Sequence, residues 1–316
     1  MIKDLITIIG RAIILTICLG ILHILHLFTH ATRVIIGCGT RLRDMLEDGL
    51  ILAGFKSMNS NEISTLKKKP NHIAIVWVPI NTTLNRLFFF KFLFDRSSTS
   101  DPEKKQDLYE VNAMANDLQC LITWSKLSGV QEISFYDERG LLKKYQYDVL
   151  ESLASTYIIG VRDSVELILP NQEHGVDQAD VLTSFLIKYN IHGSNSQPKQ
   201  TLRLNILTRQ HGHAHLVQVA RQLVTSMRNK DSSLSLNDLN VKIIGDQICS
   251  TSIGPPDLIM VLGGRSLRFR GFPPWQLNLA EIYHGRSYSI LPYQVTYREF
   301  MAAMRVYSDC EQRKGA

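Results

Sequence analysis

The sequence contains no closely spaced cysteine pair. Its five cysteines include no Cys-x-x-Cys motif and lie far apart, at Cys18, Cys38, Cys120, Cys249 and Cys310, so neither a disulfide framework nor a zinc site is indicated. No strand-like run is followed by Gly-x-Gly-x-x-Gly, which disfavours a dinucleotide-dependent oxidoreductase. A dense stripe of lysine and arginine with interleaved aromatic residues is also missing, so we do not expect a nucleic-acid partner.

Long segments of disordered composition and internal repeats are absent as well. Of the 316 residues, 45% are hydrophobic and 20% are charged, which is enough to bury one sizeable core and allows one or two domains. The formal net charge is +6. This mild positive charge suits an anionic partner, such as a membrane surface or a diphosphate, without deciding between them.

Residues 12–32 contain no aspartate, glutamate, lysine or arginine. About 20 mostly apolar residues suffice for a helix to cross a bilayer, so this run predicts one transmembrane helix, and residues 1–33 form a membrane anchor. His23, His26 and His30 share a helical face, and a place near the lipid headgroups explains them better than a metal site, since no acidic residue or cysteine joins them. A cleaved signal peptide is less favoured, because no clear cleavage site follows.

Basic residues are more numerous after the apolar run than before it. Lys3 and Arg11 precede it, whereas the other side has Arg33, Arg41, Arg43, Lys56, Lys67, Lys68 and Lys69. The positive-inside rule therefore places the C-terminal part in the cytosol. Residues 34–70 form a membrane-proximal segment in which apolar residues recur at helical spacing, and we expect an amphipathic helix followed by a linker that ends at Pro70.

Residues 71–316 alternate between strand-like and helix-like patterns. The run from His72 to Val78 is apolar and rich in β-branched residues, which is typical of a buried parallel strand. Further strands are expected at 130–140 (with a turn), 165–169, 202–207 and 257–262, and helices at 106–127, 141–156, 178–188, 213–227 and 236–246. This order predicts an α/β domain with a mainly parallel sheet flanked by helices.

Two polar clusters in this domain have local explanations. Asp137 precedes Leu141 at a position where aspartate is favoured for a turn or a helix cap, which we prefer to a role as a metal ligand. The histidines at 211, 213 and 215 have no fixed ligand spacing and no acidic neighbour. They fit a solvated loop that enters a helix better than a metal site.

The C-terminal third contains three motifs in a fixed order. They are Gly271-Phe272-Pro273-Pro274-Trp275, then Tyr297-Arg298-Glu299-Phe300, then the terminal Cys310-Glu311-Gln312-Arg313-Lys314-Gly315. This order resembles the cis-prenyltransferases, and most closely the Nogo-B receptor type, which is the non-catalytic subunit of eukaryotic dehydrodolichyl diphosphate synthase. Upstream, Ile133-Ser134-x-Tyr136-Asp137-x-x-Gly140 is similar to the same type, and the resemblance covers about residues 70–316. It implies a cis-prenyltransferase-like fold.

The resemblance implies that this chain has lost one half of the active site. In active members the first strand ends in an aspartate that engages magnesium and the allylic diphosphate, and a glycine-rich loop follows. Here Val78 occupies that position, and residues 79–86 contain no glycine. Valine cannot bind magnesium, and such a loop is poorly suited to a phosphate. We therefore expect the chain to be inactive alone, to provide no metal ligand, and to depend on a catalytic partner for Mg²⁺.

The second half of the site also departs from the family pattern. Active members have an Arg-Thr-Ser/Gly-Gly-Glu stretch and then Arg-x-Ser, whereas here Val261 replaces the first arginine and Arg265 the acidic residue. Arg265, Arg268 and Arg270 are candidates for a small anion site, although loop charges are more often simply solvated. By resemblance, a further set should pack the core and support a dimer interface: Phe272, Pro273, Pro274 and Trp275.

The terminal Arg-x-Gly is the part of the family pattern that remains. The guanidinium of Arg313 suits a diphosphate, and Gly315 has no Cβ to hinder a close backbone approach. On its own, this tripeptide is typical of a solvated chain end. The resemblance implies that it crosses a dimer interface and binds the diphosphate of isopentenyl diphosphate in the partner's site.

The leading hypothesis is a required, non-catalytic subunit of a heteromeric cis-prenyltransferase that makes the polyprenyl precursor of dolichol for protein glycosylation. Its expected partners are a catalytic cis-prenyltransferase subunit, isopentenyl diphosphate and membrane lipid. It would be a single-pass protein of the endoplasmic reticulum. The alternative is a membrane-tethered receptor or scaffold with a degenerate prenyltransferase fold, and a self-sufficient transferase is the least favoured hypothesis.

Overall fold

The computed structural model describes residues 2–52, 60–78, 102–145, 164–166, 183–189, 200–228, 239–251, 253–264, 266–285 and 293–311. In these residues, seven strands form one sheet in the order β3-β4-β5-β2-β1-β6-β7. Their bounds are β1 His72–Trp77, β2 Glu132–Asp137, β3 Ser164–Glu166, β4 Thr183–Tyr189, β5 Gln200–Thr208, β6 Leu258–Leu262 and β7 Glu281–Gly285. The five strands from β5 to β7 are parallel, and β4 is antiparallel to both β3 and β5. The predicted α/β class with a mainly parallel sheet is confirmed.

Strand β1 lies at the centre of the parallel part. It pairs with β2 on one side and β6 on the other, so that Ile75 lies opposite both Phe135 and Met260. All six of its residues are buried. Because helices or loops cover both faces of such a strand, it is a continuous apolar run rather than an alternating one. Its side chains divide between two apolar clusters, Ile73, Ile75 and Trp77 in one and Ala74, Val76 and Val78 in the other.

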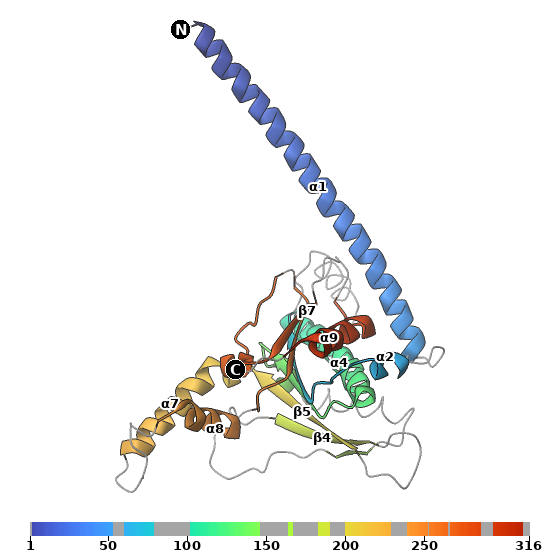
Figure 1. Ribbon diagram of the computed structural model, residues 1–316, viewed down its shortest axis with the longest axis vertical. Coiled ribbons are helices and arrows are strands. Elements are labelled where there is room, and N and C mark those ends of the chain that lie inside the picture. Colours follow the sequence, from blue (N-terminus) through green and yellow to red (C-terminus); the bar gives the residue numbers. More distant parts are fainter. Residues whose placement is uncertain are drawn as a thin grey trace.

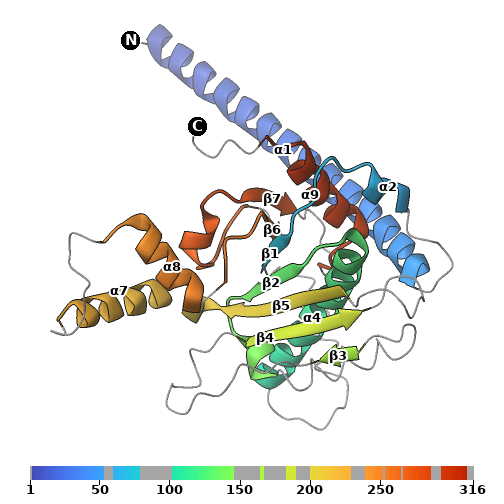
Figure 2. The same ribbon diagram turned by 60° about the horizontal axis from the view of Figure 1, so that its bottom comes forward.

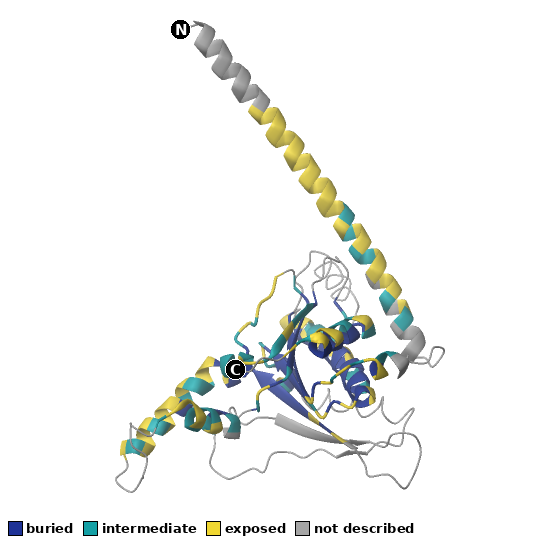
Figure 3. Cartoon of the chain, viewed as in Figure 1, coloured by how far each residue is buried: buried dark blue, intermediate teal, exposed yellow. Residues whose placement is uncertain are grey.

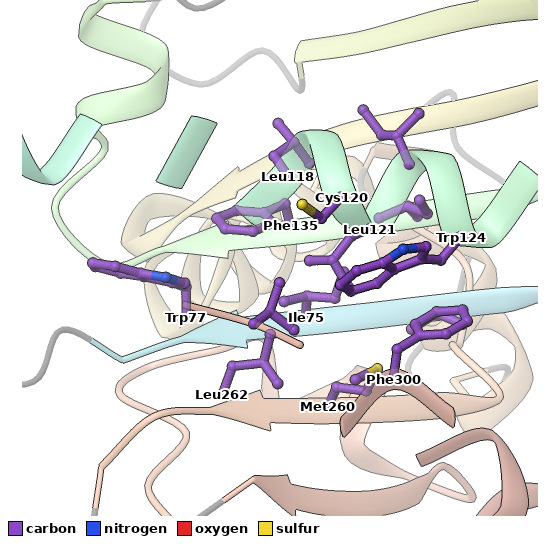
Figure 4. Packing of buried hydrophobic residues seen from close by; sticks show 14 of the residues in the cluster. Ile75, Trp77, Leu118, Cys120, Leu121, Trp124, Phe135, Met260, Leu262 and Phe300 are labelled. Atoms are coloured by element: carbon purple, nitrogen blue, oxygen red, sulfur yellow. The ribbon is translucent and has the colours of Figure 1, made fainter. Parts of the chain in front are cut away.

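Two helices cover the first face of the sheet. They are α4 (Pro102–Ser128) and α9 (Tyr297–Asp309). Trp124 of α4 packs against Phe300 of α9 with ring centroids 5.8 Å apart, close to Ile75 of β1 (Figure 4). This large apolar cluster is the main core of the protein.

The second face is covered mainly by a segment near Phe272 and the 3-10 helix η3 (Pro274–Leu277). Helices α7 (His213–Arg228) and α8 (Val241–Thr251) project from this side as an arm (Figure 2). Much of α7 is exposed, whereas the central strands are buried (Figure 3). This cluster is smaller than the first and depends on loops rather than long helices.

Helix α1 (Ile2–Leu52) extends far from the sheet (Figure 1). Within it, Leu15–Asp44 is long and apolar enough to cross a membrane by length and composition, and no part of its apolar window is buried inside the protein. The helix continues without a break beyond residue 33, past the expected end of the anchor. Near its end, Asp44 and Glu47 pair with Arg298 of α9 at 3.5 and 3.9 Å. The short helix α2 (Ser60–Ser64) follows.

Several expected elements differ from those observed. The prediction of a helix at 178–188 is wrong, because Thr183–Tyr189 forms β4 and pairs with β5. The aromatic and β-branched residues of this segment favour a strand. Strand β7 was not expected at all. The helix expected at 236–246 is observed as α8, which begins at Val241. The helix expected at 141–156 is described only as α5 (Leu141–Lys144), because its remainder lies outside the described residues.

Candidate functional site

The carboxyl ends of the parallel strands form the first candidate region. In open α/β sheets, ligands bind in crevices at this edge. A cleft of about 440 Å³ opens there beside the ends of β2 and β5, and its lining includes Glu138, Arg139, Lys143, Lys144, Arg209 and Gln210. A neighbouring cleft of about 250 Å³ lies between the ends of β1 and β2, with Trp77, Glu110 and Arg270 in its lining.

Val78 lies at the end of β1 and is only 3% exposed. Its N–H donates to the carbonyl of Leu262 at 2.9 Å, and its side chain belongs to the apolar cluster with Tyr136 and Phe272. The position is therefore filled by hydrocarbon that packs the second face of the sheet. It provides no oxygen to a cation.

Three acidic side chains near the clefts, those of Asp107, Glu110 and Glu138, are paired with basic groups of the same chain. Asp107 of α4 is buried and contacts Arg139 at 2.5 Å and Lys144 at 3.1 Å, and Arg139 also contacts Glu110 at 2.9 Å. Arg270 contacts Glu138 at 3.1 Å. Among the described residues, no three histidines, cysteines or acidic residues are arranged to hold a metal ion.

Asp137 has the local role that its position predicts. Its carboxylate accepts hydrogen bonds from the backbone N–H groups of Arg139 (2.9 Å) and Leu142 (3.0 Å), so it fixes the turn from β2 into α5. Burial raises the pKa of Asp137, and these backbone hydrogen bonds oppose that shift. The predicted turn role is confirmed, and the N-cap residue of α5 is Gly140.

The structure describes two of the three candidate arginines. Arg265 lies outside the described residues. Arg268 is exposed, and its Nε donates to Ser266 Oγ at 3.2 Å. Arg270 pairs with Glu138, and its carbonyl accepts a hydrogen bond from the Tyr136 hydroxyl at 2.7 Å. An anion site formed by the three arginines stays a prediction.

The Phe272–Trp275 segment is partly buried inside the chain itself. Phe272 and Pro273 are buried, and the ring of Phe272 meets that of Tyr136 edge-on at 5.6 Å. Pro274 and Trp275 are partly exposed. A methyl group on Gly245 of α8 would lie 3.4 Å from the Trp275 ring, so the tryptophan packs against α8 at this glycine. The interface role of the segment stays a prediction.

The C-terminal tail begins at the other end of the parallel strands, beside their amino ends. Helix α9 starts near the carboxyl end of β7, since a Cβ on Gly285 would lie 3.3 Å from the Glu299 carboxylate. It ends near the amino end of the same strand, where Cys310 Sγ contacts Glu281 at 2.6 Å. Arg313 and Gly315 lie outside the described residues. What the structure does show is the point from which they extend.

Sequence reasoning missed the buried carboxylates of α4. Asp117 is fully buried and accepts hydrogen bonds from Trp77 Nε1 at 2.9 Å and from the N–H of Val295 at 2.8 Å. Asp107 was missed too, although it lies one turn before Val111 on the apolar stripe of the helix. An acidic residue on such a stripe is a usable signal, because a buried charge needs partners.

Curated relatives share a single name. No model of a known protein family matches the chain. The dehydrodolichyl diphosphate synthase complex subunit Nus1 of Mus musculus is 27% identical over 209 residues, which are 63% of this chain and 60% of that protein. The Schizosaccharomyces pombe subunit nus1 is 23% identical over 79% of this chain and 78% of its own length, and human NUS1 is 26% identical over 63% and 61%. The matched part thus spans less than two thirds of the mouse and human relatives. The resemblance inferred from the motifs is confirmed.

Two solved structures are similar more loosely. Lavandulyl diphosphate synthase from Lavandula x intermedia has a TM-score of 0.47 and 15% identity, over 78% of this chain and 99% of that one. A probable undecaprenyl diphosphate synthase from Campylobacter jejuni has a TM-score of 0.35 and 14% identity, over 78% of this chain and 100% of that one. At these scores neither likeness supports a conclusion about function.

Proposed function

We propose that this chain is the non-catalytic but required subunit of a heteromeric cis-prenyltransferase, a dehydrodolichyl diphosphate synthase complex. The complex would condense isopentenyl diphosphate onto an allylic diphosphate and make the polyprenyl precursor of dolichol. The similarity to the mouse and Schizosaccharomyces pombe subunits of the dehydrodolichyl diphosphate synthase complex supports the assignment to such a complex. A catalytic cis-prenyltransferase subunit would be the obligatory partner.

The observation on which the non-catalytic role depends is the buried side chain of Val78. The family pattern requires a magnesium-binding carboxylate there, and the valine is 3% exposed within an apolar cluster. The nearby acidic residue Asp107 is committed to Arg139 and Lys144, so it is not a replacement ligand. Magnesium would therefore be bound mainly by the partner, and this chain alone would not transfer a prenyl group.

The position of Cys310 supports a role for the tail in trans. Helix α9 has 13 residues and is therefore about 20 Å long, so Cys310 lies about that far from the carboxyl edge. Three residues of chain span at most about 11 Å, which limits how far the Cα of Arg313 lies from Cys310. Five residues, from Cys310 to Gly315, span at most about 18 Å, so the tail would have to be almost fully extended to return to the carboxyl end of the sheet, where Val78 lies. A diphosphate bound by Arg313 and Gly315 is thus better provided by another subunit.

The contribution of this chain to the reaction would be binding and orientation. Arg313 would form a charge-assisted hydrogen bond to the diphosphate, and the N–H of Gly315 would bind beside it. Correct placement of the diphosphate positions the homoallylic double bond against the developing carbocation, which lowers the barrier without any proton transfer by this chain.

The membrane helix supports a location at a membrane surface. We propose the endoplasmic reticulum, with α1 crossing once and the sheet in the cytosol, because basic residues are concentrated after the apolar run. Membrane lipid would then be a second partner, and it would place the subunit where a growing polyprenyl product dissolves.

Reconstitution of the complex tests this function. The full chain and its candidate catalytic partner would be expressed separately and together in membranes, and prenyl transfer from isopentenyl diphosphate would be measured. We expect no product with this chain alone and a large increase when it joins the partner. Equal activity of the partner with and without this chain would contradict the proposal and favour the scaffold alternative. Product formed by this chain alone would also contradict it.

A further inference from the structure

The residues just before the C-terminal tail are held by the segment that leads into β1. The ammonium group of Lys68 donates to the carbonyl of Cys310, and it also lies 4.7 Å from the centre of the Tyr307 ring. One residue earlier, the N–H of Lys67 donates to Ser308 Oγ at 2.8 Å. The last turn of α9 and the first residue beyond it are therefore fixed by two successive residues of this segment.

A second contact reaches Cys310 from the sheet. The thiol of Cys310 donates to the Glu281 carboxylate at the start of β7, while the N–H of Cys310 donates to the carbonyl groups of Val306 and Tyr307. Cys310 thus has its N–H, its carbonyl and its side chain all bound. Few residues at the end of a chain are restrained at three points, since termini are usually loosely held.

These contacts also connect the tail to the membrane-proximal part of the chain. Glu62 of α2 pairs with Arg305 of α9 at 3.1 Å, and the exposed side chain of Lys67 lies 3.5 Å from Asp309. Such exposed ion pairs contribute little stability by themselves. The segments that they join are informative, because each ion pair connects residues 60–68 to the last three turns of α9.

We propose that Lys68 and Glu281 are positioning residues for the C-terminal tail, which set the direction in which Arg313 extends toward the diphosphate. This inference rests on the proposed function of the tail in trans. Only two residues separate Cys310 from Arg313, so the orientation of Cys310 restricts the positions that Arg313 can reach. Fixing one end of a binding segment before the ligand arrives reduces the conformational entropy lost on binding.

The test is steady-state prenyl transfer by the full complex carrying Lys68→Met. Methionine keeps an apolar stem over Tyr307 but removes the ammonium group that binds Cys310. We expect the KM for isopentenyl diphosphate to rise by about three- to tenfold, the size of effect usual for the loss of one ordinary hydrogen bond, because Lys68 acts on the diphosphate only through the tail. The kcat and the KM for the allylic diphosphate should change little, and Lys68→Arg should restore most of the affinity.

Lys69→Met is the matched control. Lys69 is the exposed neighbour of Lys68, and the same substitution removes the same charge from the same segment. Lys68→Met with a KM equal to that of Lys69→Met would overturn the proposal, as would an equal loss of activity toward both substrates, which indicates a general structural defect.

Arg313→Ala, measured in parallel, separates the role of the tail in trans from its positioning by Lys68. If it abolishes activity while Lys68→Met is silent, the tail acts in trans but is not positioned by Lys68. If Lys68→Met raises KM while Arg313→Ala is silent, Lys68 does not act through the tail, and the inference fails.

Alkylation of Cys310 tests the contact with Glu281 independently of activity. The hydrogen bond to Glu281 raises the pKa of the Cys310 thiol, so the intact complex should react slowly with iodoacetamide at pH 8. Glu281→Gln removes the negative charge and should increase the rate of Cys310 modification severalfold, as followed by mass spectrometry. An unchanged rate would show that Glu281 does not hold Cys310, and it would overturn the role of Glu281.

Discussion

At the scale of single residues, Val78 is part of the core at the position where the proposed function expects a lost catalytic aspartate. A carboxylate at this position would lie in the apolar cluster that includes Tyr136 and Phe272. We expect Val78→Asp to lower the free energy of unfolding by at least ~2 kcal/mol, because a polar group would be buried without a partner. It should not give the chain prenyl transfer activity of its own.

Chemical denaturation of the full chain in detergent would measure this loss. The matched control is Val217→Asp on α7, where the valine is 50% exposed and the same substitution should have a much smaller effect. Equal stability of the two variants would contradict the burial of Val78.

His72 gives the fold a dependence on pH. Burial lowers the pKa of His72, although the nearby Glu132 and Asp257 act in the opposite direction and Arg203 acts in the same direction as burial. Its Nε2 lies 2.8 Å from Ser134 Oγ. Because the unfolded chain takes up a proton near pH 6.5 and the folded chain only at lower pH, stability is full above about pH 6.5 and falls as the pH decreases through the folded pKa.

His72→Gln should therefore flatten the stability profile between about pH 7 and 5, whereas His213→Gln, at an exposed histidine, should leave it unchanged. Thermal unfolding at a series of pH values would measure both. A wild-type profile as flat as that of His72→Gln would refute the assignment.

The sequence allowed the roles of some residues to be predicted but not others. Val78 and Asp137 were predictable, because a strand ends at one and a turn begins at the other. The partners of Asp107 were not predictable, since Arg139 comes from a different element and meets it only after folding. Contacts between distant segments, such as Lys68 with Cys310, leave no pattern in a single sequence.

At the scale of elements, α9 runs from the carboxyl end of β7 to the amino end of the same strand. A capping box starts it, in which Thr296 Oγ1 accepts from the N–H of Glu299 and the Glu299 carboxylate accepts from the N–H of Thr296. We expect Thr296→Ala to reduce the stability of the full chain by about 1 kcal/mol. Thr296→Ser should restore most of it.

Thr225→Ala is the comparison for this helix. The exposed Thr225 hydroxyl bonds only to the carbonyl of Arg221 within its own helix, so its loss should change stability by less than about 0.5 kcal/mol. Urea unfolding of both variants would measure the difference. A Thr296→Ala variant as stable as Thr225→Ala would mean that the cap does not stabilise α9.

Elements with strong periodicity were predictable, and those that depend on neighbours were not. β1 and β6 are short apolar runs, and α4 has a clear apolar stripe, so their types were correct. β4 was mistaken for a helix because its strand state depends on pairing with β5, which the sequence does not display. β7, Glu281–Gly285, is a partly exposed edge strand with few apolar residues, and such a strand has a weak sequence signal.

At the scale of the whole molecule, α1 and the sheet are joined near α9. Arg298 contacts Asp44 and Glu47 of α1, so α1 meets the helix that leads to the tail. If α1 crosses the membrane with the sheet in the cytosol, protease added to sealed microsomes should degrade the sheet domain without detergent. Protection of that domain until detergent is added would contradict the orientation. An antibody to a lumenal protein would control for sealing.

The C-terminal tail is proposed to complete the site of a partner subunit. The most direct measurement is prenyl transfer by the complex with Arg313→Ala, with Lys314→Ala as the neighbouring control and co-purification to confirm that both complexes form. We predict that Arg313→Ala lowers activity about tenfold or more, as expected for losing a hydrogen bond between charged groups, while Lys314→Ala remains close to the wild type. Full activity of an intact Arg313→Ala complex would contradict the claim and leave Arg313 as a solvated chain end.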